Sequence, residues 1–366
     1  MELRGERMQR KEHIEIAGKA IGKGHPCFII AEAGSNFRIS EDPKINFKQA
    51  LKLIDIAADA KADAVKFQLY RAQKLYLKNS GNADYIGKEK SIFDIIKEME
   101  LPHEWLPRLK EKCDKRKIIF LCSPFDEESA DQLEKVDMPA YKIASYCITH
   151  EPLLRHIAKK GKPIIMSTGA STEKEIRRAV EIIEQEGNYR YCLMQCTTKY
   201  PAPMETINLR TIPSLMKKFG VPVGLSDHSR IPHVAPLGAV ALGAKLIEKH
   251  YTTDNGLPGP DHGFAILPHE LENMVKDIRN LEKALGNETK GILKEEMELY
   301  DFARSYIYAK RNIKKGEVYS PANIIVLRKG KREKGLEPSY YKYVLGKKAA
   351  KNVSEQEPLT KECIDR

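Results

Sequence analysis

The stretch PIIMSTGASTEKEIRRAVEIIEQEGNYRYCLMQ, residues 163–195, contains one complete unit of strand, helix and strand. Apolar runs lie at both of its ends, at Pro163–Met166 and Tyr191–Gln195, and each predicts a buried strand. Between them, Thr172 and Glu175 have the spacing of a capping box, which predicts a helix that continues to about Gln185. A strand, a helix and a second strand in this order imply parallel strands joined by a right-handed crossover.

The same alternation extends over most of the chain. Eight apolar runs predict strands: Phe28–Ala31, Ala64–Phe67, Ile118–Cys122, Ala140–Ile143, Pro163–Met166, Tyr191–Gln195, Val223–Leu225 and Leu246–Glu248. Most are separated by amphipathic helical patterns, such as Phe47–Ala60. Eight such units predict an α/β fold, a closed (β/α)₈ TIM barrel. An open doubly wound sheet is the alternative, although it needs a switch point and usually has fewer strands.

Three regions follow from this pattern. Residues 1–286 are expected to form the barrel, and the charged stretch 287–302 is expected to be a linker. In residues 303–366 short apolar runs are broken by turn residues, which predicts a small, mostly β domain. The segment Gly18–Lys23 is one residue short of a P-loop and has no strand before it, so we interpret it as a turn.

The composition indicates a globular protein outside the membrane. Hydrophobic residues make up 42% of the 366 residues, the mean hydropathy is −0.48, and the most apolar stretch, Val234–Ile247, is short and contains Lys245. The amino terminus has no apolar segment typical of a signal peptide, and the seven cysteines form no CxxC pair. We therefore expect a cytoplasmic location.

The charge is positive and unevenly spread. The net charge is +11, and residues Arg311–Lys351 contain twelve Lys or Arg against three Glu. Such a patch could bind nucleic acid, a membrane surface or an anionic small molecule, or it could simply be solvated. Aromatic residues do not interleave with the basic ones in a known RNA-binding pattern, so nucleic acid is not the expected partner. A membrane is not expected as a partner either.

Polar residues follow the predicted strands at the ends where a barrel places its chemistry. A single Ser or Thr there more often caps a helix or forms a turn. Lys66 and Lys142 are different, because each lies inside an apolar strand, where an unpaired ammonium is costly. Lysines close to several hydroxyls are typical of a phosphate or carboxylate site.

Two histidines end neighbouring strands of this predicted barrel. His228 and His250 could meet at one divalent metal ion, with Glu32 acting through a bound water. A pair of hydrogen-bonded core histidines is the competing interpretation.

Taken in order, these segments resemble the sialic acid synthase family, whose members make nonulosonic acids from phosphoenolpyruvate and an acylamino-hexose. The resemblance runs from Cys27 to about Gly286 and rests on FIIAEAGSN, ADAVKFQ, GNAD, FLCSPF, PAYKIAS, KPIIMSTG, CTTKYPAP, VPVGLSDHS, EKHYT and PGPDH. The segments ARSYIYAKRNIKKGE and VLGKKAAKNV resemble the antifreeze-like SAF domain that follows the barrel in this family.

The resemblance implies roles for the residues at the matching positions. The phosphoenolpyruvate positions match Lys66, Lys142, Ser145, Ser167 and Ser226, with Ser123 beside the phosphate. Positions around the sugar match Gln68, Asn82, Tyr200 and Asp261. His228 and His250 match the ligands of a Mn²⁺ or Mg²⁺ ion, and Glu32 matches a carboxylate near the metal-bound water. Arg328 matches an arginine that reaches the sugar from the partner subunit of a domain-swapped homodimer.

The implied reaction joins C3 of phosphoenolpyruvate to the aldehyde carbon of an N-acetylated hexosamine and releases phosphate. N-acetylmannosamine is the leading acceptor, and legionaminic- or pseudaminic-type precursors are alternatives. A condensation with a phosphorylated aldose and a non-catalytic sugar-binding barrel are further alternatives. The sequence departs from the family at Cys147, where many members carry an acidic residue, and at Asn36-Phe37, where many have Asn-His.

Overall fold

The computed structural model describes residues 13–82 and 91–365. The chain divides into two compact units, Met1–Gly286 and Asn287–Arg366. Each unit has its own hydrophobic core. In the described residues, no helix is both long and apolar enough to cross a membrane.

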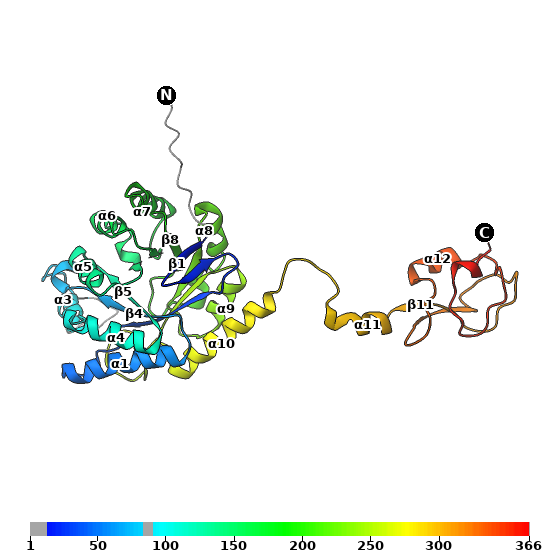
Figure 1. Cartoon of the computed structure of the whole chain (residues 1–366), viewed down its shortest axis with the longest axis horizontal. Helices are drawn as coiled ribbons and strands as arrows, with labels where there is room; N and C mark the ends of the chain where they lie inside the picture. Colours follow the sequence, from blue (N-terminus) through cyan, green and yellow to red (C-terminus); the bar gives the residue numbers. More distant parts are fainter. Residues whose placement is uncertain (1–12, 83–90, 366) are drawn as a thin grey trace, which may run out of the picture. The chain divides into compact units, whose positions relative to one another are not determined.

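The first unit is built on eight parallel strands. They are β3 (Phe28–Gly34), β4 (Ala64–Leu69), β5 (Ile119–Pro124), β6 (Tyr141–Ile143), β7 (Ile164–Ser167), β8 (Tyr191–Cys196), β9 (Val223–Asp227) and β10 (Leu246–His250). Their order in the sheet is β5-β4-β3-β10-β9-β8-β7-β6. The sheet curls into a near-closed barrel, as Figure 1 shows, which confirms the predicted TIM-like fold.

The ends of this sheet, β5 and β6, lie next to each other, but no hydrogen-bonded ladder is assigned between them in the described chain. Instead the backbone N–H of Cys122 in β5 donates to the sulfur of Met138, 3.2 Å away, just before β6. A side-chain acceptor therefore replaces a ladder hydrogen bond at the seam.

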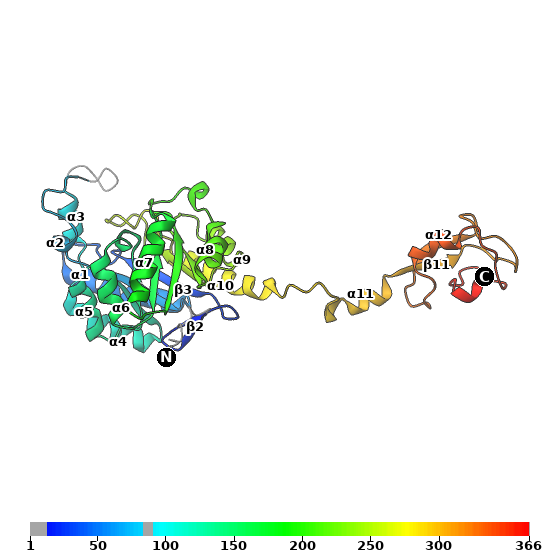
Figure 2. The same cartoon turned by 90° about the horizontal axis from the view of Figure 1, so that it is seen from above.

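Helices surround the strands in the usual alternation (Figures 1 and 2). They are α1 (Pro43–Asp59), α2 (Ala72–Leu75), α3 (Ile92–Glu98), α4 (Leu106–Arg116), α5 (Glu127–Lys135), α6 (Glu151–Lys159), α7 (Glu173–Gln185), α8 (Thr211–Phe219), α9 (Val234–Ala241) and α10 (Pro268–Leu285), with short 3₁₀ turns at His103–Trp105, Ser145–Cys147 and Met204–Thr206. Asp42 caps α1, and the capping box of Thr172 and Glu175 opens α7 as predicted.

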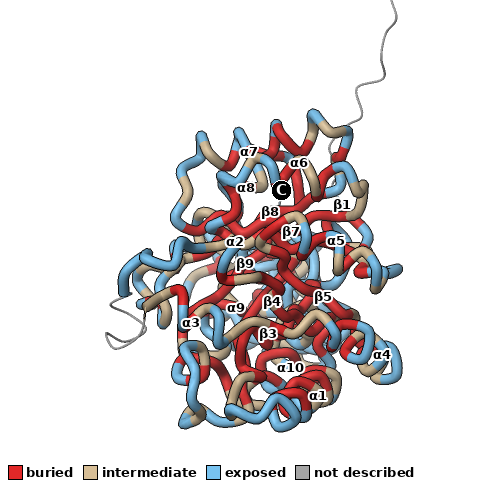
Figure 3. Tube along the Cα trace, turned by 90° about the vertical axis from the view of Figure 1, so that its left-hand side faces the viewer, coloured by how far each residue is buried: buried red, intermediate tan, exposed pale blue. Residues whose placement is uncertain are grey.

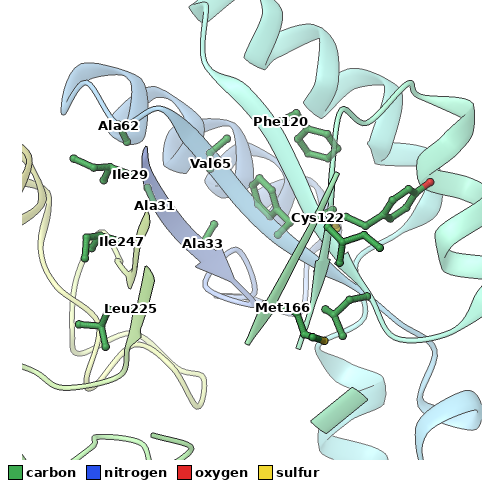
Figure 4. Close-up of a cluster of buried hydrophobic side chains, with 14 of the residues drawn as sticks. Ile29, Ala31, Ala33, Ala62, Val65, Phe120, Cys122, Met166, Leu225 and Ile247 are labelled. Atoms are coloured by element: carbon green, nitrogen blue, oxygen red, sulfur yellow. The ribbon is translucent and has the colours of Figure 1, made fainter. Parts of the chain in front are cut away.

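Alternation along the strands creates two separate apolar layers. Residues such as Ile29, Ala31 and Val65 face the helices and form the larger core, shown in Figure 4. Figure 3 shows the strands as the buried centre of this unit. The barrel interior is filled by a second cluster near the strand beginnings: Phe28, Ile30, Ala64, Leu121, Ala140, Ile165, Cys192, Met194 and Leu246.

An antiparallel hairpin precedes the barrel and was not predicted. Strands β1 (His13–Ile16) and β2 (Lys19–Gly22) pair through a tight turn in which Gly18 has φ +78°. The interpretation of Gly18–Lys23 as a turn was therefore wrong, because most of this segment is strand β2. Ile14, Ile16 and Ile21 pack into the interior cluster, so the hairpin covers the amino-terminal end of the barrel.

The second unit begins with short helices and continues as a small domain. The expected linker includes a 3₁₀ turn (Lys294–Glu296) and α11 (Met297–Phe302), because this charged stretch also contains helix-forming residues. The domain has an antiparallel sheet of β11 (Ser305–Ala309) and β12 (Ile324–Arg328), followed by 3₁₀ turns at Pro338–Tyr340 and Lys361–Cys363 around α12 (Tyr341–Val344). Its own core includes Ile307, Tyr319 and Val353.

Candidate active site

Polar side chains fill the barrel interior in the layer next to the apolar cluster, toward the carboxyl ends of the strands. Each of the eight strands contributes one inward residue at this level, within three positions of its carboxyl end or at that end itself. We call this set the inner ring: Glu32, Lys66, Ser123, Lys142, Ser167, Cys196, Ser226 and Glu248. All of them line one cavity of about 380 Å³. The period of two along a strand thus places apolar residues below and polar residues above in the same interior.

The predicted site residues gather in this cavity to a large extent. The eleven that line it are Glu32, Lys66, Gln68, Ser123, Lys142, Ser145, Ser167, Tyr200, Ser226, His228 and His250. Asp261 is adjacent, because its Oδ2 lies 3.7 Å from Nδ1 of His250. Asn82 is exposed and Arg328 belongs to the second unit, and neither is among the lining residues. Asp84 of the GNAD motif lies outside the described residues.

Four charged side chains of the inner ring form a buried network. Each is 3% exposed or less: Glu32, Lys66, Lys142 and Glu248. Nζ of Lys66 lies 2.5 Å from Oε2 of Glu32 and 3.7 Å from Oε2 of Glu248. Nζ of Lys142 lies 3.2 Å from the other oxygen of Glu248. Each buried ammonium therefore has a carboxylate partner, and this pairing offsets the free energy cost of removing the lysine charges from water.

Serine hydroxyls extend this network. Nζ of Lys66 donates to Oγ of Ser123 at 3.2 Å, and Nζ of Lys142 donates to Oγ of Ser167 at 2.8 Å. The hydroxyl of Ser145 accepts from the backbone N–H of Gly169 at 3.0 Å. A Cβ at position 169 would lie only 2.6 Å from Thr198, so the backbone approaches the site closely enough to require glycine.

The two carboxylates of the network differ in their ionisation. Burial raises the pKa of Glu32 to about 7, and the nearby charge of Glu248 adds to this, although Lys66 opposes it. Burial also disfavours the charged form of Glu248, but Lys142 and Lys66 outweigh it and hold its pKa at about 2. Two carboxylates with pKa values moved apart by their surroundings are typical of an acid–base site.

The two histidines lie at the upper rim of the cavity with their rings 5.5 Å apart. Nδ1 of His228 donates to the carbonyl of Thr197 at 2.9 Å, which leaves Nε2 as an acceptor. Nδ1 of His250 is buried without a hydrogen-bond partner, and burial lowers its pKa well below the usual range. Burial lowers the pKa of His228 too, but the nearby Cys196, Thr197 and Glu248 outweigh it and raise this pKa above its ordinary value. Two imidazoles with Glu32 and Asp261 nearby are a donor set that suits a divalent cation. The described residues contain no cluster of three or more His, Cys, Asp or Glu side chains placed to hold a metal.

One member of the network was missed from the sequence. Glu248 lies within the apolar strand LIEKH, and the reasoning applied to Lys66 and Lys142 would have identified it. The outer wall of the cavity, also missed, is largely aromatic and aliphatic and comes from loops and short helices: Tyr70, Lys74, Leu75, Tyr76, Ile96, Phe125, Ala144, Tyr146 and His150. Loop paths do not follow from strand or helix periodicity, so no sequence pattern indicated them.

The two sequence departures have different structural settings. Cys147 lines the cavity, and burial raises the pKa of its thiol to about 12, so it is neutral there. Phe37 is buried and its ring meets the edge of Trp105 at 5.8 Å. Phe37 therefore belongs to the core between the first loop and the helices rather than to the cavity.

Comparison with known proteins agrees with this geometry. The model of the NeuB family matches residues 53–290, and the model of the SAF domain matches residues 304–365. The chain is 44% identical to the spore coat polysaccharide biosynthesis protein SpsE of Bacillus subtilis, over 90% of each chain. It is 39% identical to a pseudaminic acid synthase of Campylobacter jejuni, over 89% of this chain and 93% of that one.

A solved crystal structure is also similar to this chain. The crystal structure of an N-acetylneuraminic acid (sialic acid) synthetase from Leptospira borgpetersenii superposes with a TM-score of 0.71 at 34% identity. The match covers 79% of this chain and 95% of that one.

Proposed function

The chain belongs to the NeuB family of nonulosonic acid synthases, and we propose that it condenses phosphoenolpyruvate with an N-acylated hexosamine. The observation that carries the proposal is the inner ring, in which two lysines and several serines surround a deep cavity at the carboxyl ends of the strands. Such a cavity suits a small ligand with phosphate and carboxylate groups.

In this proposal the lysines and serines bind phosphoenolpyruvate. Lys66 with Ser123 holds one anionic group, and Lys142 with Ser167 holds the other. Ser145 and Ser226 also line this part of the cavity and provide further donors. Fixed donors in a cavity that excludes water stabilise the charge that develops when phosphate leaves.

The carbon–carbon bond forms between C3 of phosphoenolpyruvate and the aldehyde carbon of the open-chain sugar. Water then adds to C2, and the bond between C2 and the phosphate oxygen breaks. A Mn²⁺ or Mg²⁺ ion, held by His228 and His250, would polarise the aldehyde oxygen. Glu32 would accept a proton from the attacking water, because a carboxyl with a pKa of about 7 exchanges protons readily near neutral pH.

The acceptor sugar would occupy the outer part of the cavity, near Gln68, Tyr200 and Asp261, with Asn82 approaching from its loop. N-acetylmannosamine is one proposed acceptor. A diamino hexose is the second, and the 39% identity to a pseudaminic acid synthase favours it. The largely aromatic and aliphatic outer wall is compatible with acetamido methyl groups.

We also infer a homodimer in which Arg328 of one subunit reaches the sugar in the cavity of the other. This inference rests on the resemblance of the second unit to the SAF domain of the family. No arginine is among the described residues that line the cavity. An arginine supplied by the partner subunit would therefore add a type of hydrogen-bond donor that the cavity wall lacks.

Phosphate release tests the function directly. The full chain would be incubated with phosphoenolpyruvate, Mn²⁺ and either N-acetylmannosamine, a diacetamido hexose or N-acetylmannosamine 6-phosphate. Mass spectrometry would identify each product. Release with one sugar, lost on chelation, supports the proposal and names the acceptor. Absence of release with every sugar contradicts it, and phosphate release that survives chelation contradicts the metal requirement.

A further inference from the structure

The side chain of Glu248 extends across the barrel interior. Its strand, β10, is separated from β6 by three strands in either direction around the eight-stranded sheet, so the two stand on opposite sides. Oε1 of Glu248 nevertheless lies 3.2 Å from Nζ of Lys142 on β6. Its other oxygen lies 3.7 Å from Nζ of Lys66 on β4, and the hydroxyl of Ser226 donates to Oε1 at 2.9 Å.

This carboxylate divides the lysines into two separate anion sites. Lys66 is paired with Ser123, and Lys142 is paired with Ser167, and Glu248 contacts both ammonium groups between them. An anion placed between the two lysines would meet the negative charge of the Glu248 carboxylate, which lies 3.7 Å from one ammonium group and 3.2 Å from the other. A ligand with two anionic groups at its ends meets no such conflict, since each group has its own lysine and serine.

We propose that Glu248 is a specificity-determining positioning residue, which makes the site select a ligand with two separated anionic groups over a single small anion. This rests on the proposed function, in which phosphoenolpyruvate is such a ligand and inorganic phosphate, the product, is the single anion. Glu248 repels a lone phosphate from the midpoint between the lysines and thereby limits product inhibition. Glu248 would contact neither reacting carbon and would act through the two lysines.

The test compares the affinities of two anions. Binding of phosphoenolpyruvate and of inorganic phosphate would be measured by calorimetry, without sugar, for the wild type and for Glu248→Gln. The glutamine keeps the size of the side chain but loses the charge. Phosphate is expected to bind about 10-fold more tightly to the variant, because the negative charge that lies between the two ammonium groups is gone. The affinity for phosphoenolpyruvate should rise less or fall, so the preference for phosphoenolpyruvate drops.

Asp227→Asn is the matched control. Asp227 ends β9, just before His228, and pairs with Lys249 at 2.6 Å. Asp227 and Lys249 are both buried but are not among the cavity-lining residues. The same change from carboxylate to amide should lower the melting temperature and leave the ratio of the two affinities unchanged. Glu248→Asp keeps the charge but shortens the reach, and it should give an intermediate ratio. This variant keeps the test available if the glutamine variant does not fold.

The outcomes separate the two proposals. Equal changes in both affinities, or a ratio that Asp227→Asn alters as much as Glu248→Gln does, would overturn the role of Glu248 while leaving the synthase function intact. A wild type that binds neither anion and releases no phosphate in the sugar panel would overturn the proposed function and this inference together.

Discussion

The phenol ring of Tyr200 lies nearly flat against the imidazole of His228, with centroids 4.2 Å apart and planes inclined by 27°. The stack and the hydrogen bond from Nδ1 to Thr197 together fix the orientation of this ring. Nε2 lies 3.5 Å from Oγ of Ser226, and both residues line the cavity. A residue chosen from the sequence for the sugar therefore also supports a proposed metal ligand.

Removal of this stack should weaken metal binding. Tyr200→Ala is expected to lower Mn²⁺ affinity about 10-fold, because an outer partner that orients a metal-binding histidine typically contributes that much. Tyr200→Phe keeps the ring and should bind Mn²⁺ like the wild type. Titration calorimetry with Mn²⁺ alone measures both variants. Equal losses in the two would contradict the stacking role.

The burial of the Glu32 carboxyl predicts a pH-dependent stability. Burial raises the pKa of Glu32 to about 7, above its ordinary value of 4.5. Glu32 therefore contributes stability below about pH 4.5, and this contribution is lost as the pH rises through 7. From pH 5 to pH 8, the unfolding free energy of the wild type should fall relative to Glu32→Gln by up to about 3 kcal/mol.

Urea unfolding, followed by the fluorescence of Trp105, measures this difference. Trp105 is the single tryptophan, and its ring packs at the edges of Phe37 and Phe47 in the barrel core. Its emission therefore reports on the first unit. Parallel pH curves for the wild type and Glu32→Gln would show that the pKa of Glu32 is not raised.

Cys147 gives a prediction about proton transfer. Its thiol pKa of about 12 keeps it neutral, so it supplies no charge to the reaction near neutral pH. Cys147→Ser should keep kcat within about 3-fold, because the change removes little volume and no charge. Steady-state phosphate release measures this. A loss of activity of 100-fold or more would instead give the thiol a direct part in the chemistry.

Separate cores predict that the first unit folds without the second. All residues in the two core clusters of the barrel precede Gly286, and the core of the second unit lies between Ile307 and Ile364. Deletion of residues 287–366 should leave the urea midpoint of the Trp105 signal within about 0.5 M of the full chain, a small shift on the scale of ordinary unfolding slopes. Activity should be lost. A chain that is fully active without these residues would contradict a role for Arg328.

Mixed subunits test whether Arg328 acts in the partner's site. Arg328→Ala and His228→Ala homodimers should each be inactive. After the two are unfolded and refolded together, roughly a quarter of wild-type activity should return, since half of the dimers are mixed and each mixed dimer has one intact site. No recovery in dimers shown to be mixed would place Arg328 in the site of its own chain.

Strand periodicity is the reason why most of the residues of the candidate site could be predicted from the sequence. A polar residue two positions beyond an inward apolar residue, such as Lys66 after Ala64, has to face the same interior, and this brings most of the predicted residues into one cavity. Glu248 carried the same signal and was overlooked. Tyr76 and Tyr146 carried none, because they lie in short helices and loops whose course depends on tertiary packing.

The hairpin β1–β2 closes the amino-terminal end of the barrel, below the site. Its isoleucines pack beneath the inner ring, and none of its described residues lines the cavity. In the proposed reaction, phosphoenolpyruvate would bind at the inner ring and the sugar above it, farther from the hairpin. Phosphoenolpyruvate would then have to bind before the sugar, and phosphate would leave after the larger product. The hairpin therefore predicts an ordered reaction, which product-inhibition kinetics would test.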